Sequence, residues 1–218
     1  MLSDSIQNYL KAIYSLNEDD KRVSTNALAE RLEVSAASVS GMIKKLDELK
    51  LVMHAPYQGV QLTSTGRKMA LEIIRHHRLI ELYLTEAMGF PWDRVHAEAE
   101  RLEHAISEEF EDRIAHILGD PTHDPHGDPI PSKDGDVRAT SRTSLAETAA
   151  GSSVCIERVR DEEPETLRAL ASFGLRPKTQ LRVISNPTGA NVIEIAIGEA
   201  ASVSVPRELG GQVFVTPM

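Results

Sequence analysis

The sequence predicts a mainly α-helical protein that ends in a small all-β domain. Three observations lead to this class. Apolar residues recur at helical spacing over most of the first 118 positions, short runs rich in Val and Ile follow from residue 154, and a stretch rich in Pro, Gly, Asp and Ser separates the two regions. A chain of 218 residues is long enough for two or three small domains. We expect these at residues 1–70, 71–141 and 142–218, with a Pro- and Gly-rich linker from about residue 119.

Three helices are expected first. Apolar residues at i, i+4 and i+7 predict a helix over residues 5–16. Thr25 is placed to cap a second helix that runs to residue 32, because a hydroxyl can accept a hydrogen bond from a free amide of the first turn. A tight turn at residues 33–35 then leads into a third helix over residues 36–50.

A β-hairpin and two longer helices are expected next. Short strands at residues 51–54 and 60–62 flank a segment whose Pro and Gly favour a turn. A helix over residues 65–88 is ended by Gly-Phe-Pro at 89–91, and a second one over residues 92–118 carries a continuous apolar face. Such a face needs a partner surface, and a homodimer can supply it.

The C-terminal region is predicted to be a small β-barrel. It contains several short segments rich in β-forming residues and one helical stretch at residues 165–173, and the lengths of these segments fit a small barrel. The expected strands lie at residues 154–159, 181–184, 192–197, 203–206 and 213–216.

The helix over residues 36–50 has a small and basic outer face when Val39, Ile43 and Leu46 face the core. Small side chains let the backbone approach the major groove, and lysines attract phosphates. A helical hairpin with a solvated polar face is the alternative, but helix, turn, helix and hairpin in this order are typical of a winged helix-turn-helix. We therefore expect double-stranded operator DNA as a partner. The assigned DNA-binding residues are Thr25, Ser35, Ala37, Ser38, Ser40, Lys44 and Lys45.

Charge and cysteine content restrict the kind of site. The net charge is −9, yet residues 1–75 hold 10 Lys and Arg against 9 Asp and Glu, whereas residues 76–120 hold 4 against 11. A DNA-reading module followed by a cation-binding one would give this asymmetry, and so would an ordinary acidic helical surface. The single cysteine, Cys155, excludes thiolate clusters and fits a reducing compartment. Without a long apolar run or a signal-type segment, we expect a cytoplasmic protein with no membrane partner.

Histidines and carboxylates cluster on the two longer helices. His77 and Glu81 are spaced i, i+4 on the first of them, and an antiparallel return could bring them opposite the second. Two sites for divalent ions are then possible, with solvated charges and helix ion pairs as the alternative. The second helix carries His96, Glu100, Glu103 and His104.

Residues 74–81 (IRHHRLIE), 95–104 (VHAEAERLEH) and 124–131 (DPHGDPIP) together resemble the diphtheria toxin repressor family of iron- and manganese-dependent repressors. The resemblance covers essentially the whole chain. It implies a helical dimerisation and metal-binding domain, an SH3-like (FeoA-like) C-terminal domain, and a homodimeric regulator of manganese or iron homeostasis genes rather than an enzyme.

The resemblance also implies two ions per subunit. The primary, activating site would use Asn8, Glu100, Glu103 and His104. The ancillary site would use His77, Glu81 and His96, completed from the C-terminal domain by Glu163, with Glu162 or Glu165 as alternatives.

Two departures from the family pattern bear on the metal. Glu100 stands where iron-dependent members carry Cys, and Asn8 stands where they carry Met and manganese-responsive members carry a carboxylate. Hard oxygen ligands suit Mn²⁺ and Fe²⁺, so we favour Mn²⁺, followed by Fe²⁺, and expect no organic cofactor. The competing functions are a winged-helix repressor that responds to an organic ligand and a helical metalloenzyme.

Overall fold

The computed structural model describes residues 3–17, 21–55, 58–160, 163–199 and 201–218. The chain divides into two compact units. The first unit comprises residues 1–76, 103–106 and 131–136, and the second comprises residues 77–102, 107–130 and 137–218. No helix in the described part of the chain is both long enough and apolar enough to span a membrane.

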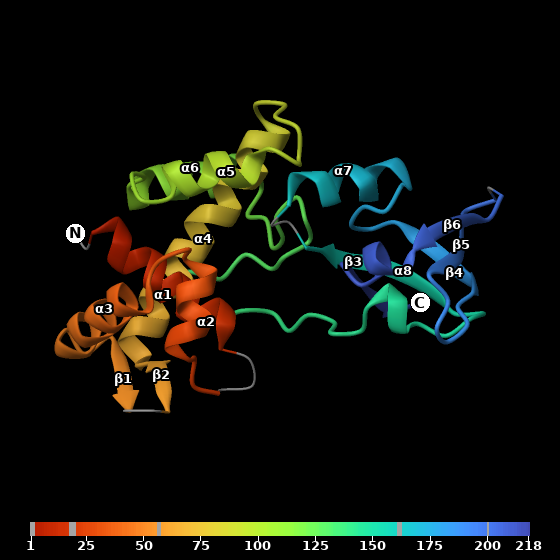
Figure 1. Cartoon of the computed structure of the whole chain (residues 1–218). Helices are drawn as coiled ribbons and strands as arrows, with labels where there is room; N and C mark the ends of the chain where they lie inside the picture. Colours follow the sequence, from red (N-terminus) through yellow and green to blue (C-terminus); the bar gives the residue numbers. More distant parts are fainter. Residues whose placement is uncertain (1–2, 18–20, 56–57, 161–162, 200) are drawn as a thin grey trace. The chain divides into compact units, whose positions relative to one another are not determined.

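The first unit is a winged helix-turn-helix, as the sequence predicted (Figure 1). The antiparallel hairpin pairs Val52 with Leu62 and His54 with Val60. Its core is built from the apolar stripe of each helix, with Leu10, Leu28 and Ile43 almost fully buried. The elements are α1 (Asp4–Leu16), α2 (Thr25–Arg31), α3 (Ala36–Glu48), β1 (Val52–Ala55), β2 (Gly59–Leu62) and the start of α4 (Ser64–Glu86).

The predicted cap of α2 was wrong by one residue. Ser24 caps the helix, and its Oγ accepts a hydrogen bond from the amide of Ala27 at 3.1 Å. Thr25 is the first helical residue, because the extended backbone that a cap requires falls at Ser24. Two adjacent hydroxyl residues offer the same cap chemistry, and the sequence alone does not separate them.

The single helix predicted over residues 92–118 was also wrong, because two helices occupy this stretch. They are α5 (Val95–Leu102) and α6 (Glu108–Ile117). Ser107 starts α6 by accepting a hydrogen bond from the amide of Phe110 at 3.3 Å, and three glutamates in the first turn favour a helix N-terminus there. The apolar spacing continues across the break, but Phe110 is 47% exposed and Ile117 is 64% exposed.

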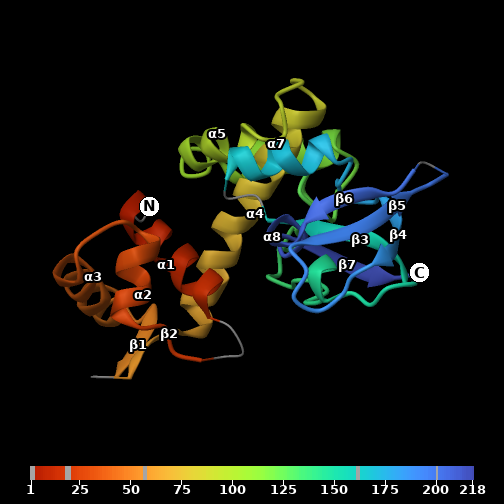
Figure 2. The same cartoon turned by 45° about the vertical axis from the view of Figure 1, so that its right-hand side comes forward.

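The C-terminal part of the second unit is a five-stranded antiparallel sheet in the order β6-β5-β4-β3-β7, an SH3-like arrangement (Figure 2). Alternate residues such as Val154 and Ile156, or Ile193 and Ile195, point into its apolar core. Each predicted strand and the predicted helix lies within two residues of its place. The elements are η2 (Leu145–Glu147), β3 (Ser153–Val159), α7 (Pro164–Ser172), β4 (Gln180–Ser185), β5 (Val192–Ile197), β6 (Val203–Pro206), α8 (Arg207–Gly210) and β7 (Val213–Pro217).

Residues 119–144 contain neither helix nor strand, as expected for a connection, but part of this segment is firmly packed. Asp124 Oδ1 accepts hydrogen bonds from the amides of His126 and Asp128, at 2.8 and 2.9 Å. The His126 carbonyl accepts a hydrogen bond from the Val159 amide at 2.9 Å, which ties the turn to β3. Gly127 has a φ of +91°, and a Cβ there would lie 2.1 Å from a backbone oxygen of β3, so only glycine fits.

Candidate metal centre and DNA-binding face

The structure brings His77, Glu81 and His96 together inside the second unit. His77 and Glu81 lie one turn apart on α4, and α5 supplies His96. Glu81 Oε1 lies 3.0 Å from His77 Nε2 and 3.1 Å from His96 Nδ1. The two imidazole nitrogens are 3.1 Å apart, and the rings meet edge to face with their centroids separated by 4.8 Å. Three donor atoms therefore converge at the spacing that one small cation can bridge.

Glu81 is fully buried, and its histidine neighbours favour the charged form of its carboxyl group. Burial would raise the pKa of its carboxyl group, but the neighbouring imidazoles of His77, His126 and His96 outweigh burial and hold the pKa well below its usual range. Its second oxygen, Oε2, has no hydrogen-bond partner among the described residues. A buried carboxylate with an unsatisfied oxygen is a site that a cation would stabilise.

A second group shares this carboxylate. Donor atoms of Glu81, Asp124 and His126 lie within 4.8 Å of one another, and all three side chains are buried. Glu81 Oε2 is 3.7 Å from His126 Nδ1. Asp124 Oδ2 is buried without a hydrogen-bond partner, and burial together with the carboxylates of Asp128 and Glu81 raises the pKa of Asp124 well above its ordinary value.

The sequence reasoning missed Asp124 and His126 as candidate ligands. From the sequence we expect His126 to be a surface or packing histidine, because it lies at no regular spacing from the histidines and carboxylates of the two longer helices. The available signal was the motif DPHGDPIP, in which two aspartates and a histidine fall within five residues of a glycine turn. Only the packing of this turn beside α4 places those side chains next to Glu81.

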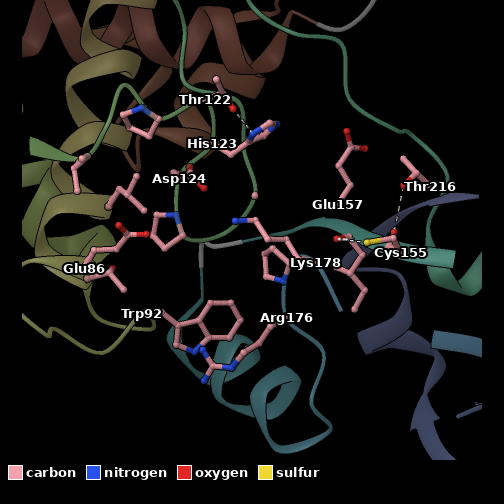
Figure 3. Close-up of a pocket in the computed structure, with 18 residues that line it drawn as sticks. Glu86, Trp92, Thr122, His123, Asp124, Cys155, Glu157, Arg176, Lys178 and Thr216 are labelled. Atoms are coloured by element: carbon pink, nitrogen blue, oxygen red, sulfur yellow. Dashed lines mark hydrogen bonds between the residues drawn. The ribbon is translucent and has the colours of Figure 1, made fainter. Parts of the chain in front are cut away.

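Asp124 also lines a cavity of about 700 Å³ in the second unit (Figure 3). Trp92 and Arg176 lie on one side of it, with the Arg176 guanidinium 4.4 Å from the Trp92 ring centroid. The Trp92 ring stacks on the His126 imidazole at a centroid distance of 5.6 Å. The cavity thus reaches Asp124 of the second group, and a metal site needs such an entry path.

Glu103 and His104 lie against α1 within the first unit. Lys11 Nζ contacts both oxygens of the fully buried Glu103 carboxylate, at 2.8 and 2.9 Å. His104 Nδ1 forms a hydrogen bond with Gln7 Oε1. Asn8 Oδ1 and His104 Nε2 are both buried and have no hydrogen-bond partner among the described residues.

Two predicted ligands are placed less tightly. Glu100 is half-buried on α5, and its Oε1 lies 3.8 Å from His96 Nε2. Glu163 is exposed at the N-terminal end of α7, where it accepts a hydrogen bond from Thr166 at 3.2 Å, and it joins none of the donor groups found in the described ranges. Of the alternatives, Glu165 is exposed in the first turn of α7 and Glu162 lies outside the described residues.

These residues fit a divalent metal ion. The donors are imidazole nitrogens, carboxylate oxygens and one amide oxygen, which is a set that first-row divalent ions accept. Four of the donor atoms are buried polar atoms without a hydrogen-bond partner in the described part of the chain, so coordination would satisfy them. They are Asn8 Oδ1, Glu81 Oε2, His104 Nε2 and Asp124 Oδ2.

The predicted DNA-binding face of α3 is exposed, while Val39, Ile43 and Leu46 are buried beneath it. Two of the predicted residues have structural duties as well: Ser35 caps α3 by accepting the amide hydrogen of Ser38, and Ser40 Oγ donates to the Ala36 carbonyl. Thr25 is only half-exposed, at the start of α2. The exposed side chains on this face are Ala37, Ser38, Ser40, Lys44 and Lys45.

Comparisons with known proteins match the chain along its length. Family models of the iron dependent repressor match its N-terminal DNA binding domain at residues 1–60 and its metal binding and dimerisation domain at residues 63–132, and a FeoA domain model matches residues 143–217. The iron-dependent repressor IdeR of Mycobacterium leprae (strain TN) is 34% identical over 227 residues, which cover 98% of this chain and 97% of that protein.

Solved structures agree in fold and sequence. A manganese-dependent transcriptional repressor in complex with manganese is 40% identical with a TM-score of 0.89, and the match covers 98% of this chain and all of that one. The manganese regulator SloR is 31% identical with a TM-score of 0.78, with 98% of each chain covered. The chain therefore belongs to the diphtheria toxin repressor family and is a metal-dependent transcriptional repressor.

Proposed function

We propose that this repressor responds to Mn²⁺, with Fe²⁺ as the second choice, and that its metal-loaded homodimer binds operator DNA. The observation that carries the proposal is the buried Glu81 carboxylate that lies between His77 and His96. Glu100 adds a hard oxygen donor at the position where the iron-dependent pattern has sulfur. The similarity to a repressor solved with manganese supports the choice of ion.

We assign two ions to each subunit. The ancillary ion would be held by His77, Glu81 and His96, and the unsatisfied Glu81 Oε2 and Asp124 Oδ2 extend this donor set toward His126. Glu163 remains a predicted ligand of the ancillary ion. The primary ion would be held by Asn8, Glu100, Glu103 and His104.

The switch would act through α1. Asn8 lies on α1, and Gln7 of the same helix contacts His104, so a metal that joined Asn8 to Glu103 and His104 would fix α1 and with it the helix-turn-helix. Exposed apolar residues of α6, such as Phe110 and Ile117, offer a dimer surface. A fixed dimer would hold two α3 helices at the spacing of successive major grooves, and linkage requires that DNA tighten metal binding to the same degree. We place the domain limits at residues 1–70, 71–141 and 142–218.

The test is an anaerobic titration of chelator-treated protein with Mn²⁺, Fe²⁺, Co²⁺ and Zn²⁺. Fluorescence anisotropy of labelled DNA from upstream of the protein's own gene reports operator binding. We expect Mn²⁺ to tighten operator binding at free concentrations that a cell can supply. The double variant E103Q/H104A should show no metal-dependent change in operator affinity. Operator affinity that is the same with and without metal would contradict the proposal and would favour a constitutive or organic-ligand-responsive repressor.

A further inference from the structure

One cation already contacts the primary ligand set. Lys11 Nζ lies 2.8 and 2.9 Å from the two oxygens of Glu103, so one ammonium group engages both. The Glu103 side chain is 0% exposed and that of Lys11 is 18% exposed. A charge pair this short and this shielded from water is stronger than a surface salt bridge, because little solvent screens it.

The neighbouring donors are not satisfied by this pair. Gln7, one helical turn before Lys11, bonds His104 Nδ1, yet His104 Nε2 has no hydrogen-bond partner among the described residues. Asn8 Oδ1, on the same helix, is buried and lacks one too. Lys11 therefore neutralises the carboxylate but leaves a nitrogen and an oxygen donor that an ammonium group at Glu103 does not serve.

We propose that Lys11 is an internal competitor of the activating metal: its ammonium occupies the Glu103 carboxylate in the metal-free protein and must leave when a divalent ion binds. The competition sets the metal concentration at which the repressor switches on. This inference rests on the proposed role of Glu103 and His104 as metal ligands, and it adds a residue that is itself no ligand.

The physical reason is like-charge repulsion. A divalent ion on Glu103 would face the lysine charge at a distance where unit charges still interact strongly in a protein interior. Lysine suits this function because its ammonium sits on a flexible stem and is readily hydrated, so the partly exposed side chain can swing into water. A positive charge opposes every divalent ion alike, so Lys11 would shift the threshold of response without selecting the metal.

Mn²⁺ binding to the full-length protein tests this directly. Free Mn²⁺ gives a six-line electron paramagnetic resonance signal that is lost on binding, so a titration yields the number and affinity of sites. We expect K11Q to tighten binding at one class of sites by roughly tenfold, equivalent to about 1.4 kcal/mol. K11R, which keeps the charge, should bind as the wild type does. K11M checks that the gain follows from lost charge rather than from the glutamine amide.

The E103Q substitution distinguishes this inference from the proposed function. E103Q, and the neutral pair K11Q/E103Q, should lose one class of Mn²⁺ site. If E103Q retains every site, Glu103 is no ligand and the proposed function fails there. If E103Q loses a site but K11Q and K11M bind no tighter than the wild type, the competition is wrong while the ligand assignment stands.

A second measurement needs no variant. Acylation of lysine amines followed by mass spectrometry should show that Lys11 reacts faster in the presence of Mn²⁺, because the ammonium is released from Glu103. Lys44 and Lys45, exposed on α3, should react at the same rate with and without the ion. Unchanged or slower labelling of Lys11 in saturating Mn²⁺ would overturn the proposal.

Discussion

Replacing Asp124 by Asn should stabilise the metal-free protein while weakening its hold on a divalent ion. Asn keeps the shape and the Oδ1 acceptor that binds the amides of His126 and Asp128. What it removes is a buried negative charge whose Oδ2 has no hydrogen-bond partner and whose pKa is raised by burial and by the carboxylates of Asp128 and Glu81. Arg78, at 3.6 Å, only partly offsets this cost.

The expected gain is about 1–3 kcal/mol, because an unsatisfied buried charge costs more than the unsatisfied neutral amide that replaces it. For a chain of this size, each kcal/mol raises the melting temperature by about 2–4 °C. Thermal unfolding in a chelator should therefore show a higher midpoint for D124N than for the wild type. D128N is the matched control: it relieves repulsion of Asp124 but loses the ion pairs of Asp128 with Arg78 and Arg158 at 3.7 Å, so its gain should be smaller than that of D124N.

The stability difference between D124N and the wild type should depend on pH in a defined direction. Because the folded-state pKa of Asp124 is raised, the folded wild type binds the proton more readily than the unfolded chain, and its stability falls as pH rises through the folded pKa. The advantage of D124N should be largest above the folded-state pKa of Asp124 and should shrink as acid protonates Asp124. An unfolding midpoint in chelator that is lower for D124N than for the wild type, or an advantage that grows in acid, would refute this account of Asp124.

Three further outcomes follow from the structure. S24A should lower the stability of the first unit by about 1 kcal/mol through loss of the α2 cap, whereas T25A should cost much less, as chemical denaturation can show. K44Q and K45Q should weaken binding to all DNA sequences and reduce the slope of log affinity against log salt by about 1 each, measured by anisotropy at several salt concentrations. H77A should lower Mn²⁺ affinity at one class of sites by at least about 10-fold in calorimetric titration. The control H116A, at the exposed histidine of α6, should leave Mn²⁺ affinity unchanged.

Periodicity predicted the elements well where a single helix or strand buries one regular face. The strands of the C-terminal sheet and helices α1 to α4 are of this kind, because alternation or helical spacing reports directly on burial. It failed at residues 103–107, where the apolar spacing runs on through a break. Ser107 caps a new helix there, and one serine among many in the sequence cannot be identified as a helix cap from its position alone.

The candidate ligands divide in the same way. His77 and Glu81 could be paired from sequence because a helix fixes residues four apart on one face, and His96 followed from an antiparallel return. Asp124 and His126 could not, because no repeating geometry relates a turn to a distant helix. Their position depends on the Gly127 conformation and on the hydrogen bond between the His126 carbonyl and β3.

Glu81 contacts both the ligands that could be predicted from the sequence and those that could not. Its Oε1 faces the two histidines that helical spacing places there, and its Oε2 faces His126 from the packed connection. One carboxylate carries a single negative charge, so a divalent ion bound at either group draws on charge that the other also needs. Asp124 is a buried residue that could supply the second charge, which would account for a carboxyl group at a position where we expect it to destabilise the metal-free fold.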